Sequence, residues 1–335
     1  MTILVTGSAG FIGFHVAQKL LKLNHKVIGI DNLNSYYSKK LKESRLGFLK
    51  KNKNYKHFNC NIKNATHVDK IFNKYQPAYI IHLAAQAGVR YSLENPAIYI
   101  DSNIKGFLNI LEASRKSKVK HLIYASSSSV YGANTKMPYS VKDSTNHPIS
   151  LYAATKKSNE LMAHAYSSIY GLPTTGLRFF TVYGPWGRPD MALFKFTSNI
   201  LKKKPIDIFN YGNHLRDFTY IEDVVDGVLK VVKKIPIKNK NWYKENLSKN
   251  TSPAPWKIYN IGNNKPVKLM KYIQELEKNL NLKAQKNFLP LQKGDVLKTF
   301  ADIKTSKKDF RYAPKTNYKK GINYFVKWFL GYYKS

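Results

Sequence analysis

The sequence predicts an α/β fold in which a doubly wound parallel sheet is joined to a smaller C-terminal domain. An apolar run, Ile3-Leu4-Val5, is followed at once by three glycines at G-x-x-G-x-x-G spacing. Runs typical of buried parallel strands then alternate with helical patterns as far as residue 180. After residue 180 this alternation stops, and loops, helices and polar segments follow one another irregularly. This change in the order of elements marks the boundary between the expected sheet domain and the smaller C-terminal domain.

The three glycines indicate a ligand. Gly7 permits a tight turn after the first strand, Gly10 lets a diphosphate approach bare backbone, and Gly13 lets helix and strand pack closely. The diphosphate would lie at a helix N-terminus, where free N–H groups favour negative charge. Asp31 ends the second strand, where a carboxylate accepts the hydroxyls of an adenosine ribose and repels the 2′-phosphate of NADP. We therefore expect a Rossmann-type fold that binds NAD.

The other elements of this first part follow in order along the chain. We expect strands at residues 2–6, 26–31, 55–59, 79–83, 120–125 and 174–179, and helices within the polar stretch 32–54 and near 65–75, 97–117 and 150–170. Parallel strands joined by right-handed crossovers place all their carboxyl ends at one edge of the sheet, where ligands bind.

The second part is less regular. We expect a loop at 184–189, a helix at 192–203, a segment 217–232 with a helical second half, an exposed excursion at 236–255, a strand at 258–262 and helices at 267–281 and 316–333. Residues 1–180 thus form the NAD-binding domain, with later returns near 213–235 and 256–264. Residues 181–335 mainly form the smaller, substrate-binding domain, which caps the nicotinamide end.

Composition excludes several classes of protein. The formal net charge is +36, but the lysines are scattered along the whole chain, so we expect no nucleic-acid partner. No apolar stretch approaches the roughly 18 residues of a membrane span, so we expect no membrane partner. Cys60 is the only cysteine, which leaves no disulfide or cysteine metal cluster, and we expect no metal. The strand that follows Met1 directly leaves no room for a signal peptide, so we expect a cytoplasmic protein.

Arginine is rare in this lysine-rich chain. Of the 56 basic residues, the arginines are Arg45, Arg90, Arg115, Arg178, Arg188, Arg216 and Arg311. Where lysine predominates, a remaining arginine can mark a site that needs a planar, bidentate donor, although so small a number is also compatible with chance.

A tyrosine and a lysine form the second chemical signal. Tyr152 and Lys156 are four residues apart in an expected helix and share one face. A free tyrosine, with a pKa of about 10, is a poor base at neutral pH. A nearby ammonium and the positive charge of NAD⁺ would stabilise the phenolate. Four serines, Ser126–Ser129, follow the fifth strand, where their hydroxyls can bond a substrate oxygen. A surface pair and a polar loop are the alternative readings.

Together these motifs resemble the extended short-chain dehydrogenase/reductases, and among them the nucleotide-sugar epimerases. The resemblance rests on Gly7–Gly13, Asp31, the set Ser127, Tyr152 and Lys156, and Arg216-Asp217-Phe218, and it runs from residue 2 to about 330. Residues 84–92 (AAQAGVRYS) and 178–192 (RFFTVYGPWGRPDMA) are similar to UDP-glucuronate 4-epimerases.

Four positions refine this resemblance. Thr181 stands where UDP-galactose/UDP-glucose epimerases typically have Asn, and Ser129 where UDP-glucuronate decarboxylases typically have Glu. Gln292 also fits the glucuronate group, because galactose epimerases tend to have Arg there. Asn61 departs from the usual Asp that contacts adenine, but its amide oxygen can still accept from the adenine amine.

The resemblance implies an isomerase that inverts C4 of UDP-glucuronate to give UDP-galacturonate through a 4-keto intermediate. Tyr152 would be the base, Ser127 would bond the same sugar oxygen, and Lys156 would hold the nicotinamide ribose. The implied cofactor-binding residues are Gly7, Gly10, Phe11, Ile12, Gly13, Asp31, Asn32, Asn61, Ile62, Leu83, Ala84, Ala85, Gln86, Asn103, Tyr152 and Lys156.

The implied substrate contacts lie at two places. Ser128, Ser129 and Thr181 are candidates for the sugar carboxylate, and Arg188 and Arg216, with Asp295 nearby, for the UDP end; Arg90 belongs to the same substrate-binding set. The resemblance also implies a homodimer through the helices near 97–117 and 150–170.

Several alternatives remain open at this point. Within the enzymes they are UDP-glucuronate decarboxylase, UDP-glucose/galactose 4-epimerase and a dehydratase, although Ser128-Ser129 stand where dehydratases typically carry Asp-Glu. From another class, the charge would suit an RNA-associated or scaffold protein that binds a dinucleotide. An intact set of Ser127, Tyr152 and Lys156 argues against that class, because a scaffold has no need of it.

Overall fold

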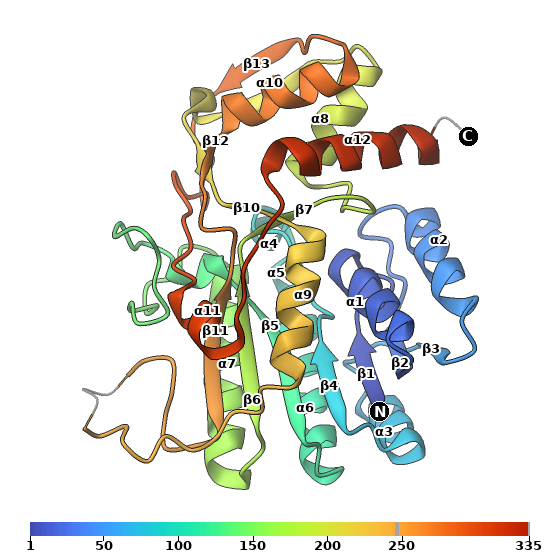
Figure 1. Cartoon of the computed structure of the whole chain (residues 1–335), viewed down its shortest axis with the longest axis vertical. Coiled ribbons are helices and arrows are strands. Elements are labelled where there is room, and N and C mark those ends of the chain that lie inside the picture. The colour runs from blue at the N-terminus through green and yellow to red at the C-terminus, as the bar shows by residue number, and fades with distance from the viewer. Residues whose placement is uncertain (245–247, 334–335) are drawn as a thin grey trace.

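A seven-stranded parallel sheet forms the body of the protein, and a smaller cap lies over one end of it (Figure 1). The structure, a computed structural model, describes residues 1–244 and 248–333. The strand order is β11-β6-β5-β4-β1-β2-β3, so the chain starts in the middle and winds outward in both directions. This order confirms the doubly wound sheet expected from the sequence.

The strands of the sheet agree closely with the predicted ranges. They are β1 (Thr2–Thr6), β2 (Lys26–Asp31), β3 (Tyr55–Asn59), β4 (Tyr79–His82), β5 (His121–Ser127), β6 (Thr174–Phe179) and β11 (Trp256–Ile261). β1, β5 and β6 are almost entirely buried. Because helices cover both faces of the sheet, its strands are buried on both sides and consist of continuous apolar runs. Such runs can be recognised in the sequence.

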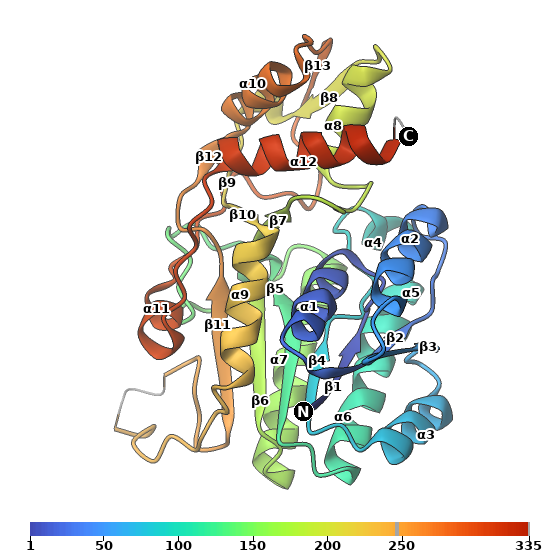
Figure 2. The same ribbon diagram turned by 45° about the vertical axis from the view of Figure 1, so that its right-hand side comes forward.

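Helices cover the two faces in separate sets (Figures 1 and 2). One set is α1 (Phe11–Lys22), α2 (Lys39–Lys50) and α9 (Ile221–Val232), and the other is α3 (Ala65–Tyr75), α6 (Gly106–Lys116) and α7 (Leu151–Tyr170). Polar caps start three of them: the side chains of Ser38, Asn64 and Ser150 accept hydrogen bonds from the first turns of α2, α3 and α7.

The cap is built from short strand pairs and three helices. The pairs are β7 (Thr181–Tyr183) with β10 (Phe218–Tyr220), β8 (Ile206–Phe209) with β13 (Lys286–Leu289), and β9 (Leu215–Arg216) with β12 (Val267–Lys268). The helices are α8 (Ala192–Leu201), α10 (Leu269–Leu280) and α12 (Tyr318–Tyr333), the last of which runs between the cap and the body (Figure 1). A short α11 (Lys304–Phe310) lies beside β11.

The structure differs from the predicted elements at one helix. The expected helix 97–117 is divided into α5 (Pro96–Tyr99), a π-helical turn η1 (Ile100–Lys105) and α6, preceded by the short α4 (Tyr91–Glu94). Turns of this type insert an extra residue and are common at functional sites. The sequence pattern predicted one continuous helix here and did not reveal the division.

Short elements without a periodic pattern were not predicted. These are β7 to β10, β12, β13, α4, α11 and the 3₁₀ turns η2 (Ser128–Tyr131) and η3 (Asn210–Gly212). Part of the expected excursion 236–255 lies outside the described residues. No helix in the described part of the chain is long and apolar enough to cross a membrane.

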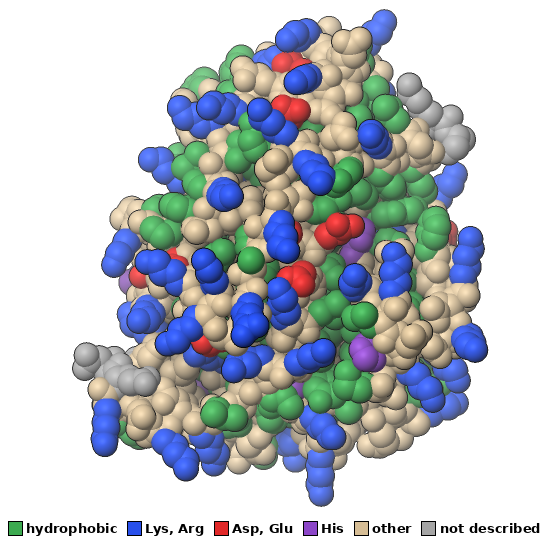
Figure 3. Space-filling model, in the orientation of Figure 1, with side chains coloured by type: hydrophobic (Ala, Val, Ile, Leu, Met, Phe, Trp, Pro, Cys, Tyr) green, Lys and Arg blue, Asp and Glu red, His purple; other side chains and the backbone are tan. Residues whose placement is uncertain are grey.

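The basic side chains are spread over the surface. Figure 3 shows Lys and Arg side chains over body and cap alike on the visible face, with far fewer acidic ones between them. This distribution agrees with a bias of composition placed on solvated positions.

Candidate functional site

A single cavity of about 880 Å³ lies where the carboxyl ends of the strands meet the cap. Its volume is at the upper end of the roughly 300–1,000 Å³ found for ligand pockets. It is lined by the glycine turn, the ends of β2, β4 and β5, the first turns of α7, and residues of β7, α8 and the cap. Every site residue predicted from the sequence lines this cavity except Asn103.

The glycine turn leaves bare backbone facing the cavity. Gly7 has a φ of 70°, which favours glycine, and a Cβ there would approach the backbone nitrogen of Ala84 to 2.8 Å. A Cβ on Gly13 would collide with the carbonyl oxygen of Gly7. α1 begins after Gly10 with no side-chain cap, so its first N–H groups remain available to an anion. This geometry fits the diphosphate of a dinucleotide.

Asp31 ends β2 and lines the cavity beside the glycine turn, where the sequence predicts the adenosine ribose. Its carboxylate accepts from the backbone N–H groups of Leu33 at 2.9 Å and Ala9 at 3.1 Å. These bonds fix the carboxylate at the end of β2, on the cavity wall. Asn61 and Ile62 lie on the same wall, as expected for the adenine side. The position agrees with the predicted preference for NAD, since a 2′-phosphate would meet a carboxylate.

Lys42 is a cavity residue that the sequence pattern did not reveal. Its Nζ donates to the carbonyl oxygen of Asn34 at 2.6 Å and to the side-chain oxygen of Asn34 at 2.7 Å. Burial lowers the pKa of Lys42 to about 8, although the nearby charge of Asp31 acts to raise it. Among so many lysines, no signal distinguished this one.

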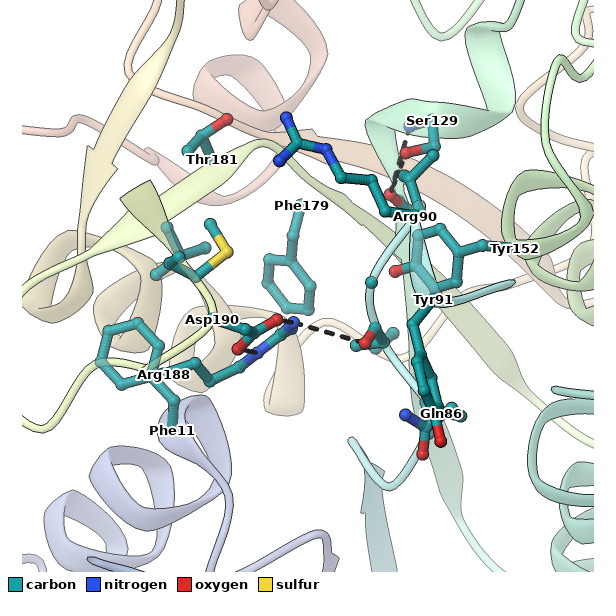
Figure 4. A pocket seen from close by; sticks show the side chains of 18 of the residues that line it. Phe11, Gln86, Arg90, Tyr91, Ser129, Tyr152, Phe179, Thr181, Arg188 and Asp190 are labelled. Atoms are coloured by element: carbon teal, nitrogen blue, oxygen red, sulfur yellow. Dashed lines mark hydrogen bonds and ion pairs between the residues drawn. The ribbon is translucent and has the colours of Figure 1, made fainter. Parts of the chain in front are cut away.

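Ser127, Tyr152 and Lys156 converge on the cavity from two elements. Ser127 ends β5, and the other two lie one turn apart on α7. Figure 4 shows the Tyr152 ring at the cavity wall, near Ser129 and Arg90. The Nζ of Lys156 donates to the carbonyl oxygen of Ala125 at 2.9 Å. The arrangement can present a phenol, a hydroxyl and an amine to a bound substrate and cofactor.

The electrostatics of this set differ from the sequence-based expectation. Burial raises the pKa of the Tyr152 phenol, and the Ser127 hydroxyl and the charge of Arg188 act in the opposite direction. Burial also lowers the pKa of Lys156 to about 8. Arg188 is thus one cation that favours the phenolate, and the predicted contribution of Lys156 stays a prediction. The sequence could not reveal the effect of Arg188, because Arg188 comes from a distant loop.

A buried ion pair holds α7 against the sheet. Arg178, in β6, donates to Glu160 from Nε at 2.8 Å and from Nη2 at 2.9 Å, and Ser126 donates to the same carboxylate at 2.7 Å. Burial acts to raise the pKa of Glu160, but Arg178 holds it below its usual value. Glu160 is one helical turn beyond Lys156, so these bonds fix the face of α7 that carries Tyr152.

Three hydroxyl residues line the cavity from two elements, the turn after β5 and the start of β7. Ser128 and Ser129 form the 3₁₀ turn after β5, and Thr181 begins β7 opposite them. Ser127 donates to the hydroxyl of Ser129 at 3.2 Å and accepts from its N–H at 3.2 Å. Figure 4 places Thr181 and Ser129 on opposite sides of the cavity mouth. Short hydroxyls without charge are suited to a carboxylate held between them.

Charged residues gather at the far end of the cavity. Asp295 accepts from Arg216 at 2.9 Å and lies 3.9 Å from Arg90 and 3.5 Å from His214. Burial, together with Arg216, lowers the pKa of His214 to about 4, so its imidazole is neutral at pH 7. Guanidinium groups in this arrangement are suited to phosphate oxygens. His214 was missed because a lone histidine carries no motif.

Arg188 does not lie with Arg216 and Asp295. Its Nε donates to Asp190 at 3.0 Å, and its Nη2 donates to the carbonyl oxygen of Ala87 at 3.4 Å. Tyr36 donates to the same carboxylate at 3.2 Å. Figure 4 shows this pair in the middle of the cavity, beside Phe11 and facing the loop of Gln86. Arg188 thus bonds Asp190 and Ala87 while Arg216 bonds Asp295, and the role of Arg188 at the UDP end stays a prediction.

Asn103 supports the cavity from behind. Its side chain accepts from the N–H of Gln86 at 2.8 Å and donates to the Gln86 carbonyl at 3.1 Å and to Thr155 at 3.0 Å. It therefore links the π-helical turn, the loop after β4 and α7. Asn103 therefore contacts the Gln86 backbone and the Thr155 hydroxyl and does not line the cavity itself.

The comparisons with known proteins agree with this geometry. The profile of the NAD dependent epimerase/dehydratase family matches residues 3–243. The chain is 55% identical to Protein CapI of Staphylococcus aureus over 100% of both chains. It is 46% identical to UDP-glucuronate 4-epimerase 5 of Arabidopsis thaliana, over 99% of this chain and 76% of that one.

A solved structure is similar over almost the whole chain. It is UDP-glucuronic acid 4-epimerase from Bacillus cereus in complex with UDP-glucuronic acid and NAD, with a TM-score of 0.86 and 33% identity, covering 99% of this chain and 100% of that one. With its glycine turn, its doubly wound sheet and a family match over most of its length, the chain belongs to the NAD dependent epimerase/dehydratase family.

Proposed function

We propose that the protein is an NAD-dependent UDP-glucuronate 4-epimerase, which inverts C4 of the hexuronate to give UDP-galacturonate. The observation that carries this proposal is the single cavity in which Ser127, Tyr152 and Lys156 lie beside the glycine turn, with uncharged hydroxyls at the sugar end. Relatives and a structural neighbour named for this reaction support it.

The chemistry divides between cofactor and protein. NAD, when bound, supplies a reversible hydride acceptor. Tyr152 takes the proton of the C4 hydroxyl and later returns one, while Ser127 bonds the same oxygen as its charge changes. Lys156 holds the nicotinamide ribose from the same helical face. The 4-keto sugar must rotate in the cavity before C4 is reduced again, so that each face of C4 in turn points towards the cofactor side.

The hydroxyls at the sugar end account for the choice of a uronate. Ser129 and Thr181 donate to the carboxylate without adding a negative charge, whereas a Glu at position 129 would place two anions together. A 4-keto uronate is a β-keto acid and loses CO₂ when its carboxylate is perpendicular to the carbonyl. Donors on both sides of the carboxylate would hold it away from that conformation, which favours epimerisation over decarboxylation.

The cap binds the nucleotide in this proposal. Arg90 and Arg216 take the diphosphate, and Asp295, released from Arg216, accepts the ribose hydroxyls. Arg188 instead acts at the middle of the cavity, where its charge favours the Tyr152 phenolate. The adenosine half of the cofactor lies along Asp31, Asn32, Asn61 and Ile62.

We also propose that the protein is a cytoplasmic homodimer. Leu108 on α6 and Leu161, Ile169 and Tyr170 on α7 are between 40% and 70% exposed, and α6 and α7 pack side by side. Such a concentration of exposed apolar side chains on two neighbouring helices suits a second copy of the same face. The resulting four-helix interface would lie beside the helix that carries Tyr152.

The test is to incubate the purified protein with UDP-glucuronate without added NAD and to identify the product by NMR. We expect UDP-galacturonate, and dinucleotide carried through purification. A UDP-pentose as the main product would assign the protein as a decarboxylase. Turnover of UDP-glucose in preference to UDP-glucuronate would assign it as a glucose/galactose epimerase.

A further inference from the structure

Arg45, on α2, is a buried cation that the proposed function does not use. It is one of the few arginines of the chain and lies outside the motifs of the family resemblance. Its side chain is 0% exposed. Because burying a charge is costly unless it is well bonded, a fully buried guanidinium in a surface helix calls for a reason.

The guanidinium joins parts of the protein that are far apart in sequence. Nη1 donates to the carbonyl oxygen of Ala9 at 2.9 Å and to the Tyr37 hydroxyl at 2.8 Å. Nη2 donates to the carbonyl oxygens of Trp186 at 2.6 Å and Gly187 at 3.3 Å. All these hydrogen-bond partners are neutral, and the Tyr37 ring centroid lies 5.5 Å from the guanidinium carbon. A planar guanidinium with several N–H donors can donate to all four acceptors at once. The single ammonium of a lysine cannot.

One end of this connection is the cofactor turn. Ala9 lies between Gly7 and Gly10, and its N–H donates to Asp31 while its carbonyl accepts from Arg45. The peptide groups that precede the free N-terminus of α1 are thus held from outside by Arg45. A diphosphate at that N-terminus would lie close to the cation and would stabilise it, since burial leaves the charge little screened.

The other end is the loop that leads to the sugar side. Trp186 has a φ of 61°, a left-handed backbone conformation that is unfavourable for a residue other than glycine. Arg45 bonds the carbonyls of Trp186 and the next residue, and His15 on α1 bonds the carbonyl of Pro185 at 2.9 Å. The same loop continues to Arg188 and Asp190 and then into α8, whose Lys195 lines the cavity.

We propose that Arg45 is a positioning residue that couples the two binding sites, so that NAD and the nucleotide sugar each strengthen the binding of the other. With the glycine turn held by the diphosphate, Arg45 keeps the strained loop in place. The loop in turn positions α8 of the cap, whose Lys195, Phe196 and Asn199 line the cavity on the side where UDP is proposed to bind. The inference rests on the proposed places of NAD and UDP in the cavity, but not on the identity of the sugar. Binding energy shared in this way is necessarily reciprocal.

The test measures how fast NAD leaves the purified protein with and without saturating UDP. UDP is the probe because it fills the nucleotide end whichever sugar is the substrate. In the wild type we expect UDP to slow NAD release by about tenfold, within the range of coupling seen between linked sites. Arg45→Lys keeps the charge but loses the planar donors, so the effect of UDP should fall to about twofold or less.

Arg311→Lys is the matched control. Arg311 follows α11 at an exposed position outside the cavity lining, and this variant should keep the wild-type response to UDP. Equal slowing by UDP in Arg45→Lys and in the wild type, with only a lower melting temperature, would reduce Arg45 to a structural role. No effect of UDP on NAD release in the wild type would overturn the proposal even if Arg45→Lys fails to fold. Absence of turnover on UDP-glucuronate would instead refute the proposed function and leave this measurement intact.

Discussion

The body and the cap contribute to the same cavity in different ways. The body supplies Ser127, Tyr152 and Lys156 from the end of one strand and the start of one helix, which are buried regular elements. The cap supplies Arg216 from a two-residue strand and Asp295 from a loop. The comparison suggests that the two parts have different roles. The regular elements of the body carry the catalytic residues, and the irregular cap recognises the substrate.

The largest expected effect falls on the body. Tyr152→Phe keeps the ring but removes the hydroxyl, so turnover should drop by roughly 10²-fold or more, as for other general acid–base groups. Binding of UDP should be unchanged, because the phenol faces the sugar. Steady-state kinetics and calorimetry measure the two quantities.

The matched control for this variant is Tyr243→Phe, which alters a tyrosine that is 75% exposed and lies outside the cavity lining. Near-normal turnover of purified Tyr152→Phe would show that Tyr152 is not the base. It would also contradict the proposal that the body performs the chemistry while the cap binds the substrate.

The next prediction tests whether Thr181 binds the carboxylate of the sugar. Thr181→Val keeps the shape of the side chain and removes one donor to a charged group, which costs about 1.5–3 kcal/mol, or roughly 10- to 150-fold. Turnover of UDP-glucuronate should fall by that factor, whereas trace activity on UDP-glucose should hardly change. A looser carboxylate would also allow some UDP-pentose to form.

Both sugars should be measured in parallel, with the pentose followed by NMR. If Thr181→Val slows the two sugars equally, Thr181 does not read a carboxylate. The uronate assignment would then lose its main support from a single residue.

Acid should weaken the body more than the cap. Burial lowers the pKa of His15, His82 and His121 to about 4, 3 and 4, and all three lie in the body. Because the unfolded chain binds protons near pH 6.5 and the folded one does not, stability is lost as the pH falls from about 6.5 towards 4. Between pH 7.5 and 5 each histidine should lower the free energy of unfolding by roughly 2 kcal/mol.

Urea unfolding at the two pH values measures this loss. His121→Gln, which retains a hydrogen-bonding side chain in the sheet, should make the dependence on pH less steep. An unchanged slope in that variant would show that the buried imidazole does not determine acid sensitivity.

The smallest effect on chemistry concerns assembly. Leu161→Glu places a charge in the exposed apolar face of α7 and should convert a dimer into a monomer in sedimentation experiments. Ile237→Glu, at a position that is 83% exposed outside that face, should remain a dimer. A wild-type protein that is monomeric at micromolar concentration and fully active would contradict the proposed interface.

The body was predictable from the sequence because its signals are local. Each of its motifs spans only a few neighbouring residues. One is the apolar run Ile3-Leu4-Val5 before Gly7, and another is Ser150 before the helix that carries Tyr152 and Lys156. Parallel strands buried on both faces also leave continuous apolar runs that are easily recognised. These elements lie within a few residues of their expected ranges.

The cap was less predictable because its contacts are not local. β8 pairs with β13, which comes much later in the chain, and neither has an alternating pattern long enough to be recognised. Arg188 was expected at the UDP end with Arg216, and its bonds to Asp190 and Ala87 were not expected. Arg45 was noted as an arginine without a motif, and only the fold shows that it contacts both Ala9 and Trp186.

One measurement tests the central claim, that the cavity removes and returns the same hydride at C4. UDP-glucuronate labelled with deuterium at C4 is incubated with the wild-type protein, and the product is analysed by NMR and mass spectrometry. We expect UDP-galacturonate that retains the deuterium at C4, without exchange with solvent. Loss of the label to water, or a product unchanged in configuration at C4, would contradict the account.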